Sequence, residues 1–282
     1  MVEPASFNLC EVEQAIADSE FAGSAVYLPT VASTNDLALE AARAGARRGV
    51  WIAGEQTAGR GRGSHTWHSS LGDGLYMSAL ISPPIPMQST LKLSFKVAIA
   101  VQSAIASVTG FRIRDQIDIR WPNDLLLNGK KCGGILIETA AQPAASTGPA
   151  MLRYAVIGIG VNCNHLTFPP ELDAIATSLR RELPDPTPPL RLEHLAAAIL
   201  LTLNDELRRL LAESEERSTE NATCELTKFS TWISGKRVRV EARDGYPSYT
   251  GTTAGLNPDG FLLVVGDDSE LHTVLSGGLR EP

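Results

Sequence analysis

Two kinds of hydrophobic spacing follow one another along most of the chain. Ser33 and the polar residues after it precede an Ala- and Leu-rich run that ends at Gly45, which predicts a capped amphipathic helix. The runs 89–108 and 190–211 repeat this helical spacing. Short apolar runs predict strands at 50–55, 75–81, 118–121 and 151–161, and Asn128-Gly129 predicts a hairpin that joins 125–127 to 132–138.

After Trp232 the pattern changes to short β runs alone. They cover 236–242, 249–254, 261–265 and 271–275 and are separated by turn-forming residues. Strands this short, with turns every eight to twelve residues, predict a small barrel of ~50 residues. The charged segment 213–221 indicates an approaching boundary, so we divide the chain into domains at 1–230 and 231–282.

Composition places the chain among ordinary globular proteins. Its 282 residues are 43% hydrophobic and 20% charged, which suits about two domains with a sizeable core. A net charge of −7 argues against a protein held on duplex DNA by its overall charge.

The cysteines and the N-terminal residues indicate the cellular compartment of the protein. The four cysteines lie far apart, which is typical of reduced thiols, and the N-terminus is acidic where a targeting peptide is basic. The most apolar helical stretch, 195–203, is about half of the ~20 residues that span a bilayer. We therefore expect a cytoplasmic protein without a membrane partner.

Glycine and arginine alternate between Gly59 and Gly63 in a loop after the strand predicted at 50–55. Glycines let backbone N–H groups approach an anion closely, and Arg60 and Arg62 add charge and forked donors. The spacing fits neither a P-loop nor a dinucleotide-binding fingerprint. Alone, the segment indicates either a cradle for a phosphate or carboxylate or a flexible basic loop.

A second segment, Arg120-Trp121-Pro122-Asn123-Asp124, precedes the predicted hairpin and brings a carboxylate near Lys131. An ordinary hairpin with solvated lysines at its tip would explain Lys130 and Lys131. It would not explain why tryptophan and proline stand before a strictly polar Asn-Asp pair, so this segment is a candidate for chemistry.

Together these segments resemble the biotin protein ligases, also called biotin–[acetyl-CoA-carboxylase] ligases. Five blocks carry the resemblance in the family's order: Ser33-Thr34-Asn35; Gln56-Thr57-Ala58-Gly59-Arg60-Gly61-Arg62 with Trp67; Arg120-Trp121-Pro122-Asn123-Asp124; Lys131-Cys132-Gly133-Gly134-Ile135-Leu136-Ile137-Glu138; and Ile157-Gly158-Ile159-Gly160-Val161-Asn162. Each block alone is weak, whereas their joint occurrence is highly specific. The resemblance implies an α+β catalytic domain of the class II synthetase-like type, with a mixed sheet flanked by helices, followed by an SH3-like barrel.

The resemblance also implies a two-step reaction. Biotin carboxylate attacks the α-phosphorus of ATP, giving biotinyl-5′-AMP and pyrophosphate, with Mg²⁺ shielding the phosphates. One lysine of the biotin carboxyl carrier domain of a carboxylase then attacks this mixed anhydride and releases AMP. Because the first step brings two anions together, positive charge must be in place where negative charge develops.

By similarity, Lys131 and Arg62 supply that charge. Asp124, a carboxylate near the family's lysine, is our candidate for orienting or deprotonating the incoming amine. The resemblance implies biotin contacts for Ser33, Thr34, Asn35, Gln56, Arg60, Gly61, Arg62, Lys131 and Gly134. It implies ATP or adenylate contacts for Gly59, Arg60, Arg62, Trp67, Asn123, Lys131 and Asn162. Metal ligands stay unknown.

The sequence also departs from the family. After Gly63 the chain continues with Ser64-His65-Thr66, whereas many relatives continue with Arg-Gly-Arg. One guanidinium is therefore missing, and whether His65 replaces its charge stays open. Only 32 residues precede Ser33, fewer than the winged helix of the family's repressors needs, so we expect a monofunctional ligase that does not bind DNA.

Two alternative functions stay open from the sequence. One is a lipoate or octanoate ligase on the same fold, and the other is a non-catalytic regulator that binds biotin or stores the adenylate. The sequence decides neither between monomer and homodimer nor which carboxylase is the acceptor.

Overall fold

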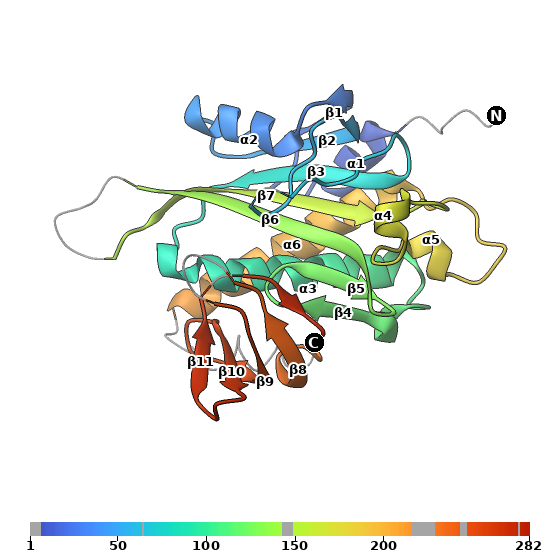
Figure 1. Ribbon diagram of the computed structural model, residues 1–282. Helices are drawn as coiled ribbons and strands as arrows, with labels where there is room; N and C mark the ends of the chain where they lie inside the picture. Colours follow the sequence, from blue (N-terminus) through green and yellow to red (C-terminus); the bar gives the residue numbers. More distant parts are fainter. Residues whose placement is uncertain (1–6, 64, 143–148, 216–228, 243–246, 276) are drawn as a thin grey trace.

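The computed structural model describes residues 7–63, 65–142, 149–215, 229–242, 247–275 and 277–282. Its larger part is a seven-stranded sheet in the order β1-β2-β3-β7-β6-β5-β4 (Figure 1). The strands are β1 (Ala25–Val31), β2 (Gly49–Gln56), β3 (Gly74–Ile81), β4 (Ile117–Arg120), β5 (Asp124–Leu127), β6 (Lys130–Ala141) and β7 (Leu152–Asn162). β1 and β2 are parallel and the other neighbours antiparallel, so the predicted mixed sheet is confirmed.

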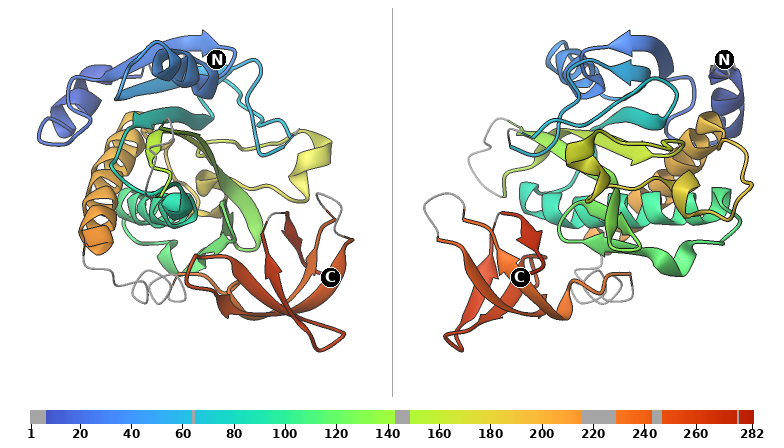
Figure 2. Two further views of the ribbon diagram at one scale, coloured as in Figure 1. Left: turned by 90° about the vertical axis from the view of Figure 1, so that its left-hand side faces the viewer. Right: turned by 45° about the vertical axis from the view of Figure 1, so that its right-hand side comes forward.

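Helices lie on both faces of this sheet. α3 (Thr90–Val108) and α6 (Leu192–Glu215) pack on each other and cover one face, and α1 (Leu9–Ala15) contacts α6 (Figure 2). α2 (Thr34–Arg43) packs on the opposite face against β2, β3 and β7. Two short helices, α4 (Pro170–Asp173) and α5 (Leu179–Glu182), follow β7, and single 3₁₀ turns precede α3 (Met87–Ser89) and β4 (Arg114–Gln116).

Successive side chains of β7 point alternately into the two helix layers on either face of the sheet. Ile157 and Ile159 belong to the core beneath α3 and α6, whereas Val156 packs with Ala38 and Leu39 of α2. Because successive side chains of a strand point to opposite faces, Gly158 and Gly160 lie on the α2 side. Their bare backbone lets Asn35, near the start of α2, and Trp67 pack close to the sheet around a hollow.

The apolar stretch 195–203 lies in α6, and a second, longer apolar stretch was not anticipated. Met87–Val108, which contains α3, is long and apolar enough to cross a membrane by length and composition, and its most apolar 18 residues have a mean hydropathy of 1.4. Of these 18 residues, 67% are buried inside the protein, where α3 contacts α6 and β6. Its hydrophobicity is thus used in the core.

The C-terminal part is an antiparallel sheet in the order β11-β10-β9-β8-β12. Its strands are β8 (Ser234–Val240), β9 (Tyr249–Leu256), β10 (Leu262–Gly266), β11 (Leu271–Val274) and β12 (Leu279–Arg280). The small β domain predicted after Trp232 is confirmed, with β12 as an addition. The boundary at 230/231 stays a prediction, and part of the charged segment 213–221 lies outside the described residues.

The β domain is attached to the strand that leads into the Trp-Pro-Asn-Asp segment. Trp121 Nε1 donates to the carbonyl of Gly260 at 3.3 Å, and the Thr231 N–H donates to Asp118 Oδ1 at 2.9 Å. The guanidinium of Arg120 lies 5.6 Å from the ring centroid of Trp232. The β domain thus holds one side of the hollow in place.

Candidate active site

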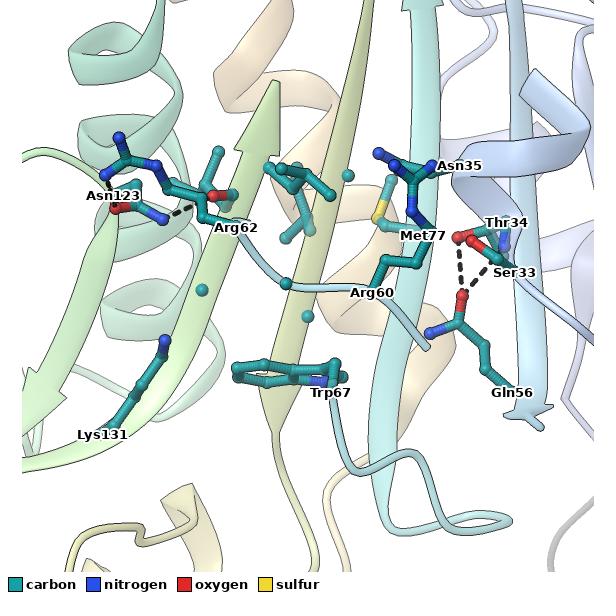
Figure 3. A pocket seen from close by; sticks show the side chains of 17 residues that line it. Ser33, Thr34, Asn35, Gln56, Arg60, Arg62, Trp67, Met77, Asn123 and Lys131 are labelled. Atoms are coloured by element: carbon teal, nitrogen blue, oxygen red, sulfur yellow. Dashed lines mark hydrogen bonds between the residues drawn. The ribbon is translucent and has the colours of Figure 1, made fainter. Parts of the chain in front are cut away.

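A cavity on the α2 side of the sheet gathers most of the residues predicted from the sequence (Figure 3). Of the predicted residues, it is lined by Ser33, Thr34, Asn35, Gln56, Arg60, Gly61, Arg62, Trp67, Asn123, Lys131 and Gly134. The remaining lining residues, which we did not predict, are Met77, Ile135, Leu136, Gly158, Ile159 and Gly160. Gly59, Asp124 and Asn162 lie next to the cavity without lining it.

One end of the cavity is a network of neutral hydrogen bonds around the start of α2. Gln56 Oε1 accepts from the Thr34 N–H at 2.9 Å and from Thr34 Oγ1 at 3.1 Å, while Gln56 Nε2 donates to Ser69 Oγ at 3.1 Å. The buried Ser78 Oγ lies 2.7 Å from Thr34 Oγ1 and 2.5 Å from Asn35 Oδ1. Each polar group is fixed by another, so this end presents short polar atoms in a set geometry.

The glycine-arginine loop is clasped to this end by Arg60. Its guanidinium donates to Asp36 Oδ1 at 2.7 Å and to Glu138 Oε1 at 2.9 Å. Glu138 Oε2 also accepts from Asn35 Nδ2 at 2.9 Å. Partial burial alone would lower the pKa of Arg60, but the two carboxylates raise it. Arg60 therefore stays charged and ties the loop to α2 and β6.

Hydrogen bonds within the loop close it into a small hairpin. The Gly61 N–H donates to the His65 carbonyl at 2.8 Å, and the Trp67 N–H donates to the Gly59 carbonyl at 2.9 Å. The Gly61 N–H, which we expected to face the ligand, is thus used inside the loop. His65 contributes its backbone here, and its side chain is not among the cavity lining.

The opposite end of the cavity carries charge. Lys131 Nζ lies 2.7 Å from Asp124 Oδ1, and Arg120 Nη2 donates to Asp124 Oδ2 at 2.6 Å. Burial alone would raise the pKa of Asp124, but Lys131 and Arg120 hold it below its ordinary value. Asp124 is therefore an ionised anchor that fixes Lys131.

Arg62 stands at the same end, as Figure 3 shows. Arg62 Nη1 donates to Asn123 Oδ1 at 3.2 Å, and Asn123 Nδ2 donates to the Ile135 carbonyl at 2.8 Å. Asn123 is thus positioned by β6 and in turn positions Arg62. The structure brings Arg62 and Lys131 into one cavity although 69 positions separate them in the chain (131 − 62).

Trp67 lies between the two ends and packs directly on β7. Its ring centroid is 5.3 Å from Lys131 Nζ, and a Cβ added at Gly160 would come within 2.6 Å of the indole. Only glycine fits at position 160 with the indole there. Within the described part of the chain, the buried Trp67 Nε1–H has no hydrogen-bond partner, so it is a donor available to a bound molecule.

Asn162 serves the backbone at the end of β7. Its Nδ2 donates to the carbonyl of Thr177 at 3.1 Å and lies 3.5 Å from that of Lys131. This arrangement joins β7 to β6 and to the segment before α5. The predicted contact of Asn162 with ATP stays a prediction.

Residues that could form a metal centre are not clustered in the described part of the chain. No group of three or more His, Cys, Asp or Glu side chains there is close enough to hold a metal ion. A metal in this cavity would depend mainly on ligands supplied by a bound molecule.

Some of the residues we missed follow a period of two. Leu136 follows the predicted Gly134 by two positions on β6, and Gly158 and Gly160 are likewise two positions apart on β7, which places them on the cavity face. Glycines at alternate positions of a strand were the available signal. Nothing in the sequence pointed to Ser78.

Two family models match the chain. Residues 27–162 match the Biotin/lipoate A/B protein ligase family, and residues 233–277 match the Biotin protein ligase C terminal domain. The second match falls on the small β domain and agrees with its predicted SH3-like type.

Curated relatives cover most of the chain. The bifunctional ligase/repressor BirA of Bacillus spizizenii is 39% identical over 269 residues, which are 93% of this chain and 75% of the relative. The biotin–[acetyl-CoA-carboxylase] ligase of Paracoccus denitrificans is 35% identical over 162 residues, 57% of this chain and 59% of the relative.

Solved structures share the fold. The biotin protein ligase of Aquifex aeolicus in complex with biotin and ATP has a TM-score of 0.71 at 23% identity, covering 92% of this chain and 100% of that chain. That of Leishmania major in complex with biotin has a TM-score of 0.60 at 25% identity, covering 90% and 99%.

Proposed function

The chain belongs to the biotin protein ligase family, and on this premise we propose that it activates biotin with ATP as biotinyl-5′-AMP and transfers the biotinyl group to one lysine of a carrier domain. The observation that carries the proposal is the division of the cavity. One end is lined by neutral hydrogen-bonding groups beside the cation of Arg60, which is already paired with Asp36 and Glu138, and Lys131 and Arg62 stand at the other end. Biotin has the same division, with a neutral ureido ring at one end and a carboxylate at the other.

The ureido ring belongs at the neutral end. Its carbonyl is one strong acceptor and its two N–H groups are donors, so it needs short polar side chains in fixed positions. Ser33, Thr34, Asn35 and Gln56 are the candidates, since all line the cavity there. The ring is fixed by neutral groups, and the carboxylate is left to extend past Trp67 toward Lys131.

Adenylation takes place at the charged end. A carboxylate oxygen of biotin forms a bond to the α-phosphorus, and the bond from that phosphorus to the pyrophosphate oxygen breaks. Lys131 and Arg62 offset the negative charge on the phosphoryl oxygens, and their hydrogen bonds to Asp124 and Asn123 fix them in advance. Preorganised charge is effective because little reorganisation is needed during the reaction.

Mg²⁺ enters, in this proposal, as part of the substrate MgATP. This agrees with the lack of a metal-binding cluster among the described residues and with the preference of Mg²⁺ for phosphate oxygens and water. The protein's own task is then to place the cations of Lys131 and Arg62.

Transfer uses the same end of the cavity. The ε-nitrogen of the acceptor lysine bonds to the biotinyl carbonyl carbon, the bond from that carbon to the phosphate oxygen breaks, and AMP leaves with the electron pair. The amine must lose a proton to be a nucleophile. Both oxygens of Asp124 already accept from protein cations and its pKa is lowered, which favours orienting Lys131 over abstracting that proton.

The remaining partners follow from the family and the charge. We propose a cytoplasmic ligase with no operator DNA among its ligands, resting on the net charge of −7, although the relatives named bifunctional ligase/repressor make this worth testing. Unchanged migration of duplex DNA in a gel-shift assay with protein, biotin and ATP would support it. Whether the enzyme is a monomer or a homodimer does not enter the proposed chemistry.

A transfer assay with labelled biotin, ATP, Mg²⁺ and an isolated biotin carboxyl carrier domain tests the proposal. We expect label on one carrier lysine and pyrophosphate released without carrier. A parallel reaction with lipoate and octanoate covers the alternative ligase, and the proposal fails if those acids are adenylated in preference to biotin. A protein that binds biotin but releases no pyrophosphate would be a regulator instead.

A further inference from the structure

A second cavity adjoins the first and opens between the two domains. It has a volume of about 470 Å³ and lies among the start of α3, the middle of β6 and the β-domain loop that contains Asp259 and Phe261. Arg62, Asn123, Ile135 and Leu136 line both cavities. The second cavity therefore leads to the charged end of the first, where the mixed anhydride would lie.

The loop from the β domain is held firmly at this place. The Gly260 carbonyl accepts from Trp121 Nε1 at 3.3 Å, and Gly260 adopts a φ of +89° that favours glycine. A Cβ at Gly260 would come within 3.0 Å of Phe95 on α3. Asp259 is thereby fixed at the cavity wall.

The charged side chains on the wall of the second cavity determine which kind of ligand it can accept. Among its described lining residues the ionisable side chains are Arg62 and Asp259, and the other walls are mostly apolar, including Leu91, Ile137 and Phe261. A polyphosphate would meet a single cation and be repelled by Asp259. An alkylammonium would find apolar walls for its methylene stem and a carboxylate for its charge.

We propose that the second cavity is the entry channel for the acceptor lysine side chain, with Asp259 attracting its ammonium and the apolar walls guiding its stem toward the anhydride. This rests on the proposed function and adds where the carrier domain presents its lysine. The proton of the ammonium is lost to water on the way in, before the nitrogen attacks.

The test separates the two half-reactions of the full-length enzyme. Adenylation is followed by pyrophosphate release without carrier, and transfer by labelling of an isolated carrier domain from preformed biotinyl-5′-AMP. For Asp259→Asn we expect the KM for the carrier domain to rise about threefold, and for Asp259→Lys about tenfold. The KM values for ATP and biotin should change by less than about twofold.

Glu270→Lys is the matched control, because it makes the same change of charge on the β domain and does not line the channel. Ser94→Trp is a steric variant that should narrow the channel and slow transfer at least about tenfold. Both proteins need an unfolding midpoint near that of wild type to be compared.

Two outcomes would contradict the proposal that the second cavity is the entry channel for the acceptor lysine. One is a raised KM for ATP or slowed pyrophosphate release in the Asp259 variants with normal transfer, since the cavity would then hold nucleotide. The other is unchanged transfer in Asp259→Lys and Ser94→Trp. Failure of the proposed function itself would be distinct, since the wild-type protein would then label no carrier domain.

Discussion

The two ends of the cavity hold their side chains in different ways. At the neutral end, Thr34, Gln56 and Ser78 satisfy one another through uncharged hydrogen bonds. At the charged end, one partly buried carboxylate, Asp124, accepts from two cations, Lys131 and Arg120. Under the proposed function, this difference separates recognition from reaction in space: neutral groups would select the ring, and charges would act on the phosphate.

The largest expected effect is at the charged end. Lys131→Ala should slow adenylate formation at least about a hundredfold, because a preorganised cation is lost where negative charge develops. Pyrophosphate release at saturating biotin and ATP measures it. Lys130→Ala is the control, since Lys130 is adjacent in the chain but bonds the Asp173 carbonyl at 3.3 Å and lies outside the cavity. Equal rates for the two variants would remove Lys131 from the reaction.

The variant Asp124→Asn tests whether Asp124 orients Lys131 or deprotonates the acceptor amine. If Asp124 orients Lys131, the variant should slow both adenylation and transfer by about tenfold, because Lys131 loses its charged partner. If Asp124 takes the proton of the acceptor amine, transfer alone should slow. Separate rates of the two half-reactions decide between these roles.

Gln56→Ala tests the neutral end. The Thr34 N–H loses its acceptor and the ring loses a positioned amide, so we expect the KM for biotin to rise about tenfold, or about 1.4 kcal/mol. The kcat should change by less than about twofold, in contrast with Lys131→Ala. Gln116→Ala, outside the cavity, is the control. A large loss of kcat in Gln56→Ala would contradict the assignment of binding to one end of the cavity and reaction to the other.

The clasp that Arg60 forms at the neutral end should have a smaller effect. Arg60→Ala removes both carboxylate contacts, but the Arg60 side chain is 40% exposed, so we expect the bound adenylate to dissociate only about threefold faster. Arg48→Ala, another exposed arginine near the end of α2, is the control. Release of labelled adenylate measures the rate, and an unchanged rate would show that the clasp does not retain the ligand.

The smallest effect concerns stability at low pH. Asp124 has a lowered pKa, so its contribution is present above the pKa of the unfolded chain, about 3.9, and is lost as pH falls through the folded value. The difference in free energy of unfolding between wild type and Asp124→Asn should thus be constant from pH 8 to pH 5 and shrink only below about pH 4. Urea unfolding at each pH measures it, and a difference that shrinks between pH 7 and pH 5 would contradict the lowered pKa.

Most elements were predictable because their patterns are strong and local. α2 begins at the predicted cap, where Ser33 Oγ accepts from the Asp36 N–H at 3.4 Å, and the Asn128-Gly129 hairpin forms as expected with both residues at positive φ. α1 and β1 were missed. The more and less exposed positions of β1 do not alternate regularly, and that strand lies at the sheet edge, where only β2 pairs with it.

The site was predictable only in part, for physical reasons. Arg62 and Lys131 belong to recognisable motifs, so the sequence marked them. Ser78 lies in an ordinary apolar strand, and Glu138 matters because three-dimensional packing places it beside Arg60 and Asn35. The second cavity, with Asp259 on its wall, depends on how two domains meet, which no local pattern records.

A double-mutant cycle of Gln56→Ala and Lys131→Ala tests the separation of the two ends most directly. The quantity is kcat/KM for biotin in pyrophosphate release for wild type, both single variants and the double variant. If recognition and reaction are separate, the two losses should multiply to within about twofold. A double variant that departs from that product by more than about tenfold, or 1.4 kcal/mol, would contradict the account.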